Sequence, residues 1–152
     1  MNAPKISIKN LVKNGWVPAN TSTITPSFST GWYDRKNVSP QITFTDPVEV
    51  PISSGTTGFF GIVTGGVPNQ YWSGSIAVNI WVTREGLSVS GVNPKKCVFE
   101  VREEIKRIVQ AGYESISDLD YVSWGGGFEE VNDKNIPVVY KFVGEINYGY
   151  LS

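Results

Sequence analysis

The sequence predicts an α+β domain in which an antiparallel β-sheet is packed by one long α-helix and carries a long β-hairpin or flap insertion. Three observations support this fold class. Residues 93–112 repeat apolar side chains at helical spacing. Residues 73–83 and 138–150 alternate as strands do, and residues 46–72 are rich in Gly and Pro. The 152 residues suit one domain, 1–152, with a sizeable core.

The chain begins with a lead-in over residues 1–39. Within it, residues 6–16 predict a short helix, which Gly15 ends, and residues 19–29 predict an extended linker. The apolar face of that helix consists of Ile8, Leu11 and Val12. Residues 40–45 then predict the first strand, because Ile42 and Phe44 alternate with threonines.

The insertion over residues 46–72 combines glycines and prolines with a central apolar cluster. This cluster consists of Phe59, Phe60, Ile62 and Val63. A loop that hangs in water does not usually expose such a group, and a connection of this length inside a small domain is usually functional. We therefore expect the flap, over residues 51–72, to contact a neighbouring subunit or another protein of the same assembly; the rival interpretation is that it folds back on its own sheet as a lid.

Residues 73–83 form the clearest predicted strand, with Ile76, Val78, Ile80 and Val82 on one face. The other face carries Ala77, Asn79, Trp81 and Thr83. The closing strand, 138–150, likewise places Val143 opposite Phe142. Because both faces carry apolar side chains, we expect neighbouring molecules to cover one of them.

The helix predicted over residues 93–112 has signals at both ends. Asn93 can cap the first turn, and Pro94 suits the first helical position. Gly112 is expected to close the last turn in the left-handed conformation. The apolar stripe consists of Cys97, Val101, Ile105 and Ile108, with Val98 and Val109 beside it. Burial of each large aliphatic residue contributes roughly 1.5–3 kcal/mol, so packing dominates.

The other side of this helix is expected to be polar, and it consists of Glu100, Arg102, Glu103, Glu104, Lys106, Arg107 and Gln110. Glu103 and Arg107 are spaced for an i,i+4 ion pair worth roughly 0.2–0.5 kcal/mol. We therefore expect Ile105→Asp to be strongly destabilising and Glu104→Ala to change little.

After the helix, residues 121–130 predict a strand interrupted by the run Gly125–Gly127. The glycines indicate a bulge, a bend or a close approach of backbones. Residues 132–135 predict a turn into the closing strand.

Composition bounds the function. The net charge is −1, which gives no basic surplus for nucleic acid, and no apolar run approaches the roughly 20 residues of a membrane span. With no histidine and one cysteine, Cys97, the chain lacks the residues of His-based triads and of most zinc sites. The N-terminus also lacks the apolar core of a signal peptide. We expect a protein that is not an enzyme and needs no cofactor.

Two groups of residues remain as candidates for chemistry or binding. The carboxylates Asp118, Asp120, Glu129, Glu130 and Asp133 are interpreted as solvated loop ends, although such pairs serve glycosidases as acid and base. A weak calcium site at Asp118 and Asp120 is an alternative that the ligand spacing does not specify. Exposed aromatics either anchor an interface or stack on sugars, as in a carbohydrate-binding module. The predicted interface residues are Phe59, Phe60, Ile62, Val63, Trp72, Trp32 and Trp124.

The order of elements resembles the tail-terminator family of long-tailed viruses, which is related to the tail-completion and minor tail proteins. The resemblance covers residue 10 to the C-terminus. It lies in the entry Pro40-Gln41-Ile42-Thr43-Phe44, a long insert, the alternating strand 75–82, an amphipathic helix and two closing strands. The lead-in over residues 21–39 departs from the family, which usually opens with a firmer helix.

The resemblance implies a structural virion protein without catalytic residues. Its copies would form a homo-oligomeric ring, expected to be a hexamer, that caps the tail tube and joins it to the head side. The implied partners are further copies of the chain, a tail-tube protein and a head–tail connector protein. The implied location is the neck region of the virion tail, after assembly in the host cytoplasm. A tail-tube or connector protein of the same machine and a carbohydrate-binding module are the alternatives.

Overall fold

The computed structural model of the chain describes residues 3–37, 40–52, 63–64, 67–68, 70–83, 93–132 and 138–151. The helices are α1 (Pro4–Asn14), the short 3-10 helix η1 (Pro18–Thr21) and α3 (Pro94–Ala111). The strands are β1 (Ser27–Ser29), β2 (Gln41–Phe44), β3 (Val48–Pro51), β4 (Val63–Thr64), β5 (Val67–Pro68), β6 (Tyr71–Thr83), β7 (Tyr121–Asn132) and β8 (Val139–Leu151).

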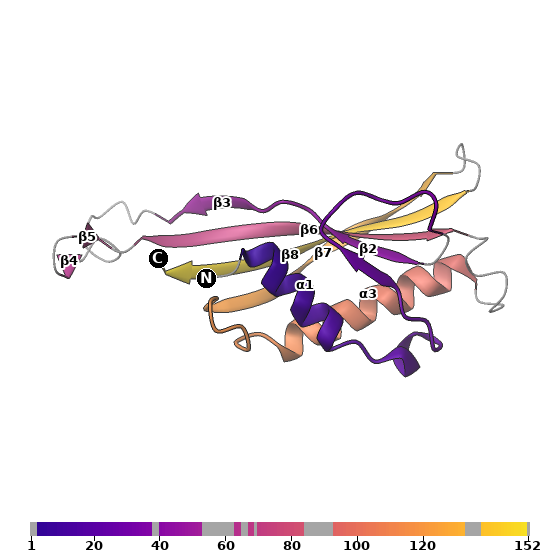
Figure 1. Cartoon of the computed structure of the whole chain (residues 1–152), viewed down its shortest axis with the longest axis horizontal. Helices are drawn as coiled ribbons and strands as arrows, with labels where there is room; N and C mark the ends of the chain where they lie inside the picture. The colour runs from indigo at the N-terminus through magenta and orange to yellow at the C-terminus, as the bar shows by residue number, and fades with distance from the viewer. Residues whose placement is uncertain are drawn as a thin grey trace.

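The predicted α+β fold class is confirmed: a six-stranded, mostly antiparallel sheet packs against the long helix α3. Five strands follow the order β1-β2-β6-β8-β7, and β3 pairs with β6 beyond the end of β2. Only the β1–β2 pair is parallel within the described residues. Figure 1 shows both α1 and α3 on the same side of these strands.

The core lies between this side of the sheet and the helices. The predicted face of β6 is confirmed, since Ile76, Val78, Ile80 and Val82 are each at most 1% exposed. From α3, Val101 and Ile105 are fully buried against it, and from α1, Ile8 and Val12 are too. The alternating and helical periods therefore identified the two surfaces that meet.

The ends of α3 follow the sequence signals in one case and depart from them in the other. The Asn93 side chain accepts a hydrogen bond from the Lys95 amide at 2.9 Å, as predicted for a cap. The left-handed prediction for Gly112 is wrong, because its φ is −95°. The helix instead ends with the Gly112 amide bonded to the Ile108 carbonyl, and the next turn is closed by Ser115.

The lead-in is more structured than predicted. The short helix is confirmed as α1, but the extended linker expected over residues 19–29 contains part of η1 and the strand β1. Phe28 of β1 lies beside Ile42 of β2 in a parallel pair. The prediction failed because β1 is only three residues long and gains its partner from a later segment.

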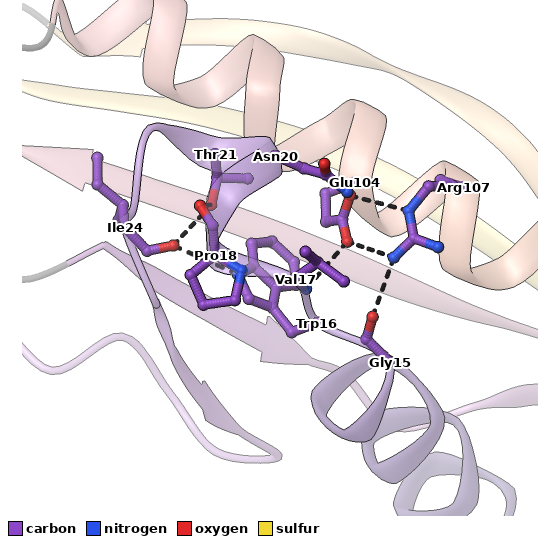
Figure 2. Close-up of polar contacts among 9 residues, drawn as sticks. All are labelled: Gly15, Trp16, Val17, Pro18, Asn20, Thr21, Ile24, Glu104 and Arg107. Atoms are coloured by element: carbon purple, nitrogen blue, oxygen red, sulfur yellow. Dashed lines mark hydrogen bonds and ion pairs between the residues drawn. The ribbon is translucent and has the colours of Figure 1, made fainter.

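A buried carboxylate fastens this lead-in to α3 (Figure 2). Glu104, 2% exposed, accepts hydrogen bonds from the Val17 amide at 3.2 Å and from the Asn20 side chain at 2.8 Å. Arg107 donates to both carboxylate oxygens, at 3.0 and 2.5 Å, and also to the Gly15 carbonyl at 3.0 Å. These contacts compensate the charge of Glu104 and join α3 to the segment that directly follows α1.

Two predictions for the polar side of α3 are wrong. Glu104 does not face solvent, because it follows Val101 by three residues and therefore lies beside the apolar stripe, where η1 covers it. Arg107 pairs with Glu104 and not with Glu103, whose carboxylate instead lies 3.1 Å from Arg102.

The insertion is partly a strand of the main sheet. Within residues 46–72, β3 pairs with β6 from Val48 beside Ser75 to Pro51 beside Trp72. Further along the chain, β4 and β5 form a small hairpin. Figure 1 shows β3, β6 and β8 extending past both helices, with this hairpin at the far end. The sheet thus carries an arm that the helices do not cover.

Candidate subunit-contact surface

The candidate site is the face of the sheet opposite α1 and α3, called the open face below. Strand register assigns side chains to it, because neighbours of Ala77 and Val143 across the strands share their face. Val48, Val50 and Phe128 are its most exposed apolar members, at 70%, 56% and 56%. The pairs across the strands are Val48 with Ser75, Val50 with Ser73, Ala77 with Glu145, Asn79 with Val143, and Val143 with Phe128.

A hollow of about 280 Å³ lies in the middle of the open face. Its lining residues are Thr45, Asp46, Val48, Ser75, Ala77, Gly125, Gly126, Gly127, Phe128, Val143, Gly144 and Glu145. The walls are therefore mainly apolar, and two carboxylates stand among them. Asp46 forms an ion pair with Lys5, whereas Glu145 is exposed and has no ion pair within the described ranges.

The glycine run shapes the floor of this hollow. The predicted bulge is confirmed, since the β7–β8 register shifts between Trp124 and Gly126. Gly126 has a φ of +88°, which other residues rarely adopt. At Gly127 an added Cβ would lie 2.1 Å from the Val143 carbonyl oxygen. The glycines thus permit a bulge and a close strand approach that side chains would prevent.

The open face also carries a fastened loop, residues 30–37, called the Trp32 loop below. It connects the parallel strands β1 and β2 and crosses the sheet on the side away from the helices (Figure 1). The buried Gln41 amide holds it: the side-chain oxygen accepts from the Asp34 amide at 2.9 Å, and the nitrogen donates to the Asp34 and Asn37 carbonyls at 2.7 and 2.9 Å. The loop is thereby anchored to β2.

An aromatic stack secures the same loop. The Tyr33 ring stacks on Trp81 of β6 with centroids 4.7 Å apart, and the Lys141 ammonium lies 4.5 Å from the Trp81 ring centroid. The Trp81 indole N–H donates to Thr43 at 3.0 Å. Burial raises the pKa of Tyr33, with Arg35 opposing and Asp34 adding to the shift. Trp81 therefore lies on the open face and not in the helix-covered core.

This fastened loop presents Trp32 to solvent with 96% of its surface exposed. Arg35 and Lys36 follow it and are also exposed, and no ion pair engages either of them in the part of the chain that the structure describes. Tryptophan is enriched among the residues that carry most of the binding energy of interfaces, so Trp32 is the first candidate for an interface anchor.

The other predicted interface residues lie elsewhere. Trp72 and Trp124 are half-buried and pack against the core cluster. Trp124 stacks on Phe142, with ring centroids 6.1 Å apart. Val63 lies in β4. Phe59, Phe60 and Ile62 lie outside the described residues, so the flap cluster stays a prediction.

A second carboxylate, the half-buried Glu49, holds β3 in place. Tyr148 donates a 2.5 Å hydrogen bond to Glu49, and Tyr150 donates to the other carboxylate oxygen at 3.1 Å. Burial, followed by the bond to Glu49, raises the pKa of Tyr148 well above 10.0. Because Glu49 points to the helix side of the sheet, its neighbours Val48 and Val50 are turned onto the open face.

The candidate catalytic carboxylates do not come together. Glu129 lies 3.9 Å from Arg102, and Glu130 lies 3.8 Å from Lys141, on opposite faces of β7. Asp118 is half-buried and Asp120 exposed in the connection before β7, and Asp133 lies outside the described residues. Among the described residues, no three His, Cys, Asp or Glu gather as a metal site requires.

The single cysteine is part of the core. Cys97 is 1% exposed, and burial, together with the charge of Glu100, raises the pKa of its thiol to about 12. It therefore stays protonated near neutral pH and lacks the thiolate that a nucleophile needs.

Sequence patterns missed the hollow and the anchors of the Trp32 loop. One signal pointed to the hollow: Gly144 on β8 faces the Gly125–Gly127 run on β7, as the register confirms. No sequence pattern indicates that Tyr33 contacts Trp81 or that Gln41 contacts Asp34, because these residues are not related by helical or strand spacing.

No helix among the described residues is long and apolar enough to cross a membrane. In comparisons with known proteins, no family model matches the chain, and no curated protein matches it either.

Proposed function

We propose that this protein is a structural subunit of a virus tail whose copies assemble into a ring, in the manner of a tail terminator. The observation that carries the proposal is the open face, which bears Val48, Val50 and Phe128 at more than half exposure around a glycine-floored hollow. Exposed apolar groups of this kind usually mark an association surface.

The arm adds a second surface. Beyond the helices, β3, β6 and β8 continue as a ribbon that ends in the β4–β5 hairpin (Figure 1). On the arm, Leu151 at the end of β8 is 52% exposed, and Ile52, which directly follows β3, is 38% exposed. A ring requires two different surfaces on each copy, and the arm and the open face offer them.

The viral setting comes from the resemblance in element order. A proline-entered strand, a long insertion, a long alternating strand, an amphipathic helix and two closing strands recur here as β2, the β3–β5 region, β6, α3, β7 and β8. Under this proposal the ring sits in the neck region of the tail. Its further partners are the tail-tube protein and the head–tail connector protein.

The carbohydrate-binding alternative is less well supported by the aromatic side chains. Trp72 and Trp124 are half-buried in the core packing, and Trp81 is covered by Tyr33. Among the tryptophans Trp32, Trp72, Trp81 and Trp124, Trp32 alone is largely exposed to a sugar. A platform for a polysaccharide needs more than one such ring.

The test is the assembly state of the purified full chain. Light scattering coupled to size-exclusion chromatography should give a mass that is a whole multiple of the 16.7 kDa chain, expected to be six. Negative-stain images should show closed rings. A monomer at the highest soluble concentration would contradict the proposal, and retention of that monomer on a glycan array would favour the carbohydrate-binding alternative.

A further inference from the structure

Trp32 and the hollow are complementary in size, apolar character and charge, but they do not touch within one chain. Trp32 is 96% exposed and is not among the residues that line the hollow. The backbone of its loop is fixed by Gln41 and by the Tyr33–Trp81 stack, so the place of Trp32 on the open face is set before a partner binds. A loop that is already ordered need not be ordered again on binding, so only the Trp32 side chain has to be immobilised.

The hollow has the size and chemistry for one indole ring. Its volume is about 280 Å³ and it is open to solvent, so a planar ring can enter it from outside. Val48, Ala77 and Val143 supply apolar walls, and the glycine floor allows a flat ring to approach the backbone. A carboxylate at the rim can accept the indole N–H, which seeks a partner when it is buried.

The charges around the two features are complementary. Arg35 and Lys36 outnumber Asp34 in the Trp32 loop, so the loop is basic. The hollow carries Asp46 and Glu145, of which only Asp46 has an ion pair within the described ranges, with Lys5. Opposite charges placed around an aromatic anchor speed association and fix its orientation.

We propose that Trp32 of one copy inserts into the hollow of a second copy, with Arg35 and Lys36 beside the second copy's Glu145. The inference rests on the proposed function insofar as both require self-association. It goes further by naming the anchor, its receptor and the charges that align them.

Two variants test the contact separately. Trp32→Ala removes the anchor, and Ala77→Phe fills the hollow from its wall. Each should raise the dissociation constant of self-association at least about 30-fold, the effect of a strong interface anchor. Phe99→Ala, which removes another half-exposed aromatic from the helix side, is the control for the first variant and should leave association unchanged. Ala77→Ser is the control for the second.

Mixing the two impaired variants gives the sharper result. Trp32→Ala retains the hollow and Ala77→Phe retains the tryptophan, so equimolar amounts should form a complex that neither forms alone. Sedimentation velocity measures it. Circular dichroism melts of each variant should match the wild type, because both sites lie outside the core.

A charge exchange provides an independent check. Glu145→Lys and Lys36→Glu should each weaken self-association. An equimolar mixture of the two variants should associate more strongly than either variant alone at the same ionic strength, because each copy then faces an opposite charge.

The outcomes separate the two proposals. A monomeric wild type would overturn both. A wild type that forms rings, with Trp32→Ala and Ala77→Phe forming them equally well, would overturn this contact and leave the proposed function standing. A failure of the mixed variants to associate, while the wild type does, would also overturn it.

Discussion

The two faces of the sheet are built from alternating residues of the same strands, yet they are covered in different ways. Ile76, Val78 and Ile80 of β6 are at most 1% exposed beneath α1 and α3. On the other face of the same strand, Ala77 lines the hollow and Trp81 lies under Tyr33 of the Trp32 loop. The helices cover one face within the chain, and the other face leaves Val48, Val50 and Phe128 exposed.

The carboxylates of the two faces show the same difference. Glu104, on the helix side, is 2% exposed and bonds to Arg107, Asn20 and the Val17 amide. Glu145, on the open face, is exposed and has no ion pair within the described residues. A charge that a fold buries must be compensated inside the fold, whereas an exposed charge is compensated by solvent.

The largest effect is expected from charging the covered face. Ile105→Asp places an unpaired carboxylate at a position with no solvent exposure, and it should destabilise the fold by at least about 4 kcal/mol, enough to unfold it. Gln110→Asp, at an exposed position in the last turn of the same helix, should cost no more than about 1 kcal/mol, from the lower helix propensity of Asp and its charge near the helix C-terminus. Similar urea unfolding curves for the two variants would show that the covered face is misassigned.

The next effect concerns the buried charge. The small effect that the sequence predicted for Glu104→Ala is wrong, because the structure buries this carboxylate. The substitution leaves Arg107, Asn20 and the Val17 amide without their shared acceptor, and it should cost about 2–3 kcal/mol of unfolding free energy. The loss stays in this range because the Arg107 side chain is 46% exposed, so water can solvate its charge after the substitution. Glu103→Ala removes a carboxylate whose side chain is 43% exposed and is the matched control, expected to change stability by less than about 0.5 kcal/mol. Equal losses in chemical denaturation would contradict the role given to Glu104.

Acid should weaken the same contact. Burial alone would raise the pKa of Glu104, but the hydrogen bonds from Arg107, Asn20 and Val17 outweigh it and hold the pKa below its ordinary value of 4.5. A carboxyl with a lowered folded pKa adds stability above its unfolded pKa and loses it as the pH falls through the folded value. The stability gap between wild type and Glu104→Gln should therefore be full at pH 7 and shrink below pH 4.5. Urea titrations across this range measure it, and a gap that stays constant into strong acid would refute it.

The contrast between the faces also marks how far the sequence could predict the structure. Long periodic segments identified β6, β8 and α3, because each buries one whole face against a layer. The strands β1 and β3 were missed because they are three and four residues long and are fixed by pairing with distant residues. Glu104 was misassigned because its charge suggested solvent, and its partner Asn20 lies 84 residues away.

The open face and the Trp32 loop were only partly predictable, because their parts come from distant segments of the chain. Trp32 stood out as an aromatic in a polar loop, and the structure leaves it exposed. The hollow, however, gathers residues from four separate segments, those around Thr45, Ala77, Gly126 and Glu145. No local pattern states that these segments meet, since strand register decides it.

The smallest effect on stability is expected on the open face, at Tyr33. Tyr33→Ala removes the ring that stacks on Trp81, and it should cost about 0.5–1.5 kcal/mol of unfolding free energy. Tyr33→Phe keeps the ring and is the matched control, expected to behave like the wild type. Denaturant unfolding with circular dichroism measures both.

The same pair of variants separates stability from association. Tyr33→Ala leaves Trp32 in the chain but removes one of the two anchors of its loop, the other being the Gln41 hydrogen bonds. A freed loop must be ordered again on binding, so self-association should weaken although the inserted side chain is unchanged. Tyr33→Phe should associate normally. If Tyr33→Ala lost stability but associated as strongly as the wild type, the fixed position of Trp32 would have no part in the contact, and the open face would have to associate through the apolar residues of β3 instead.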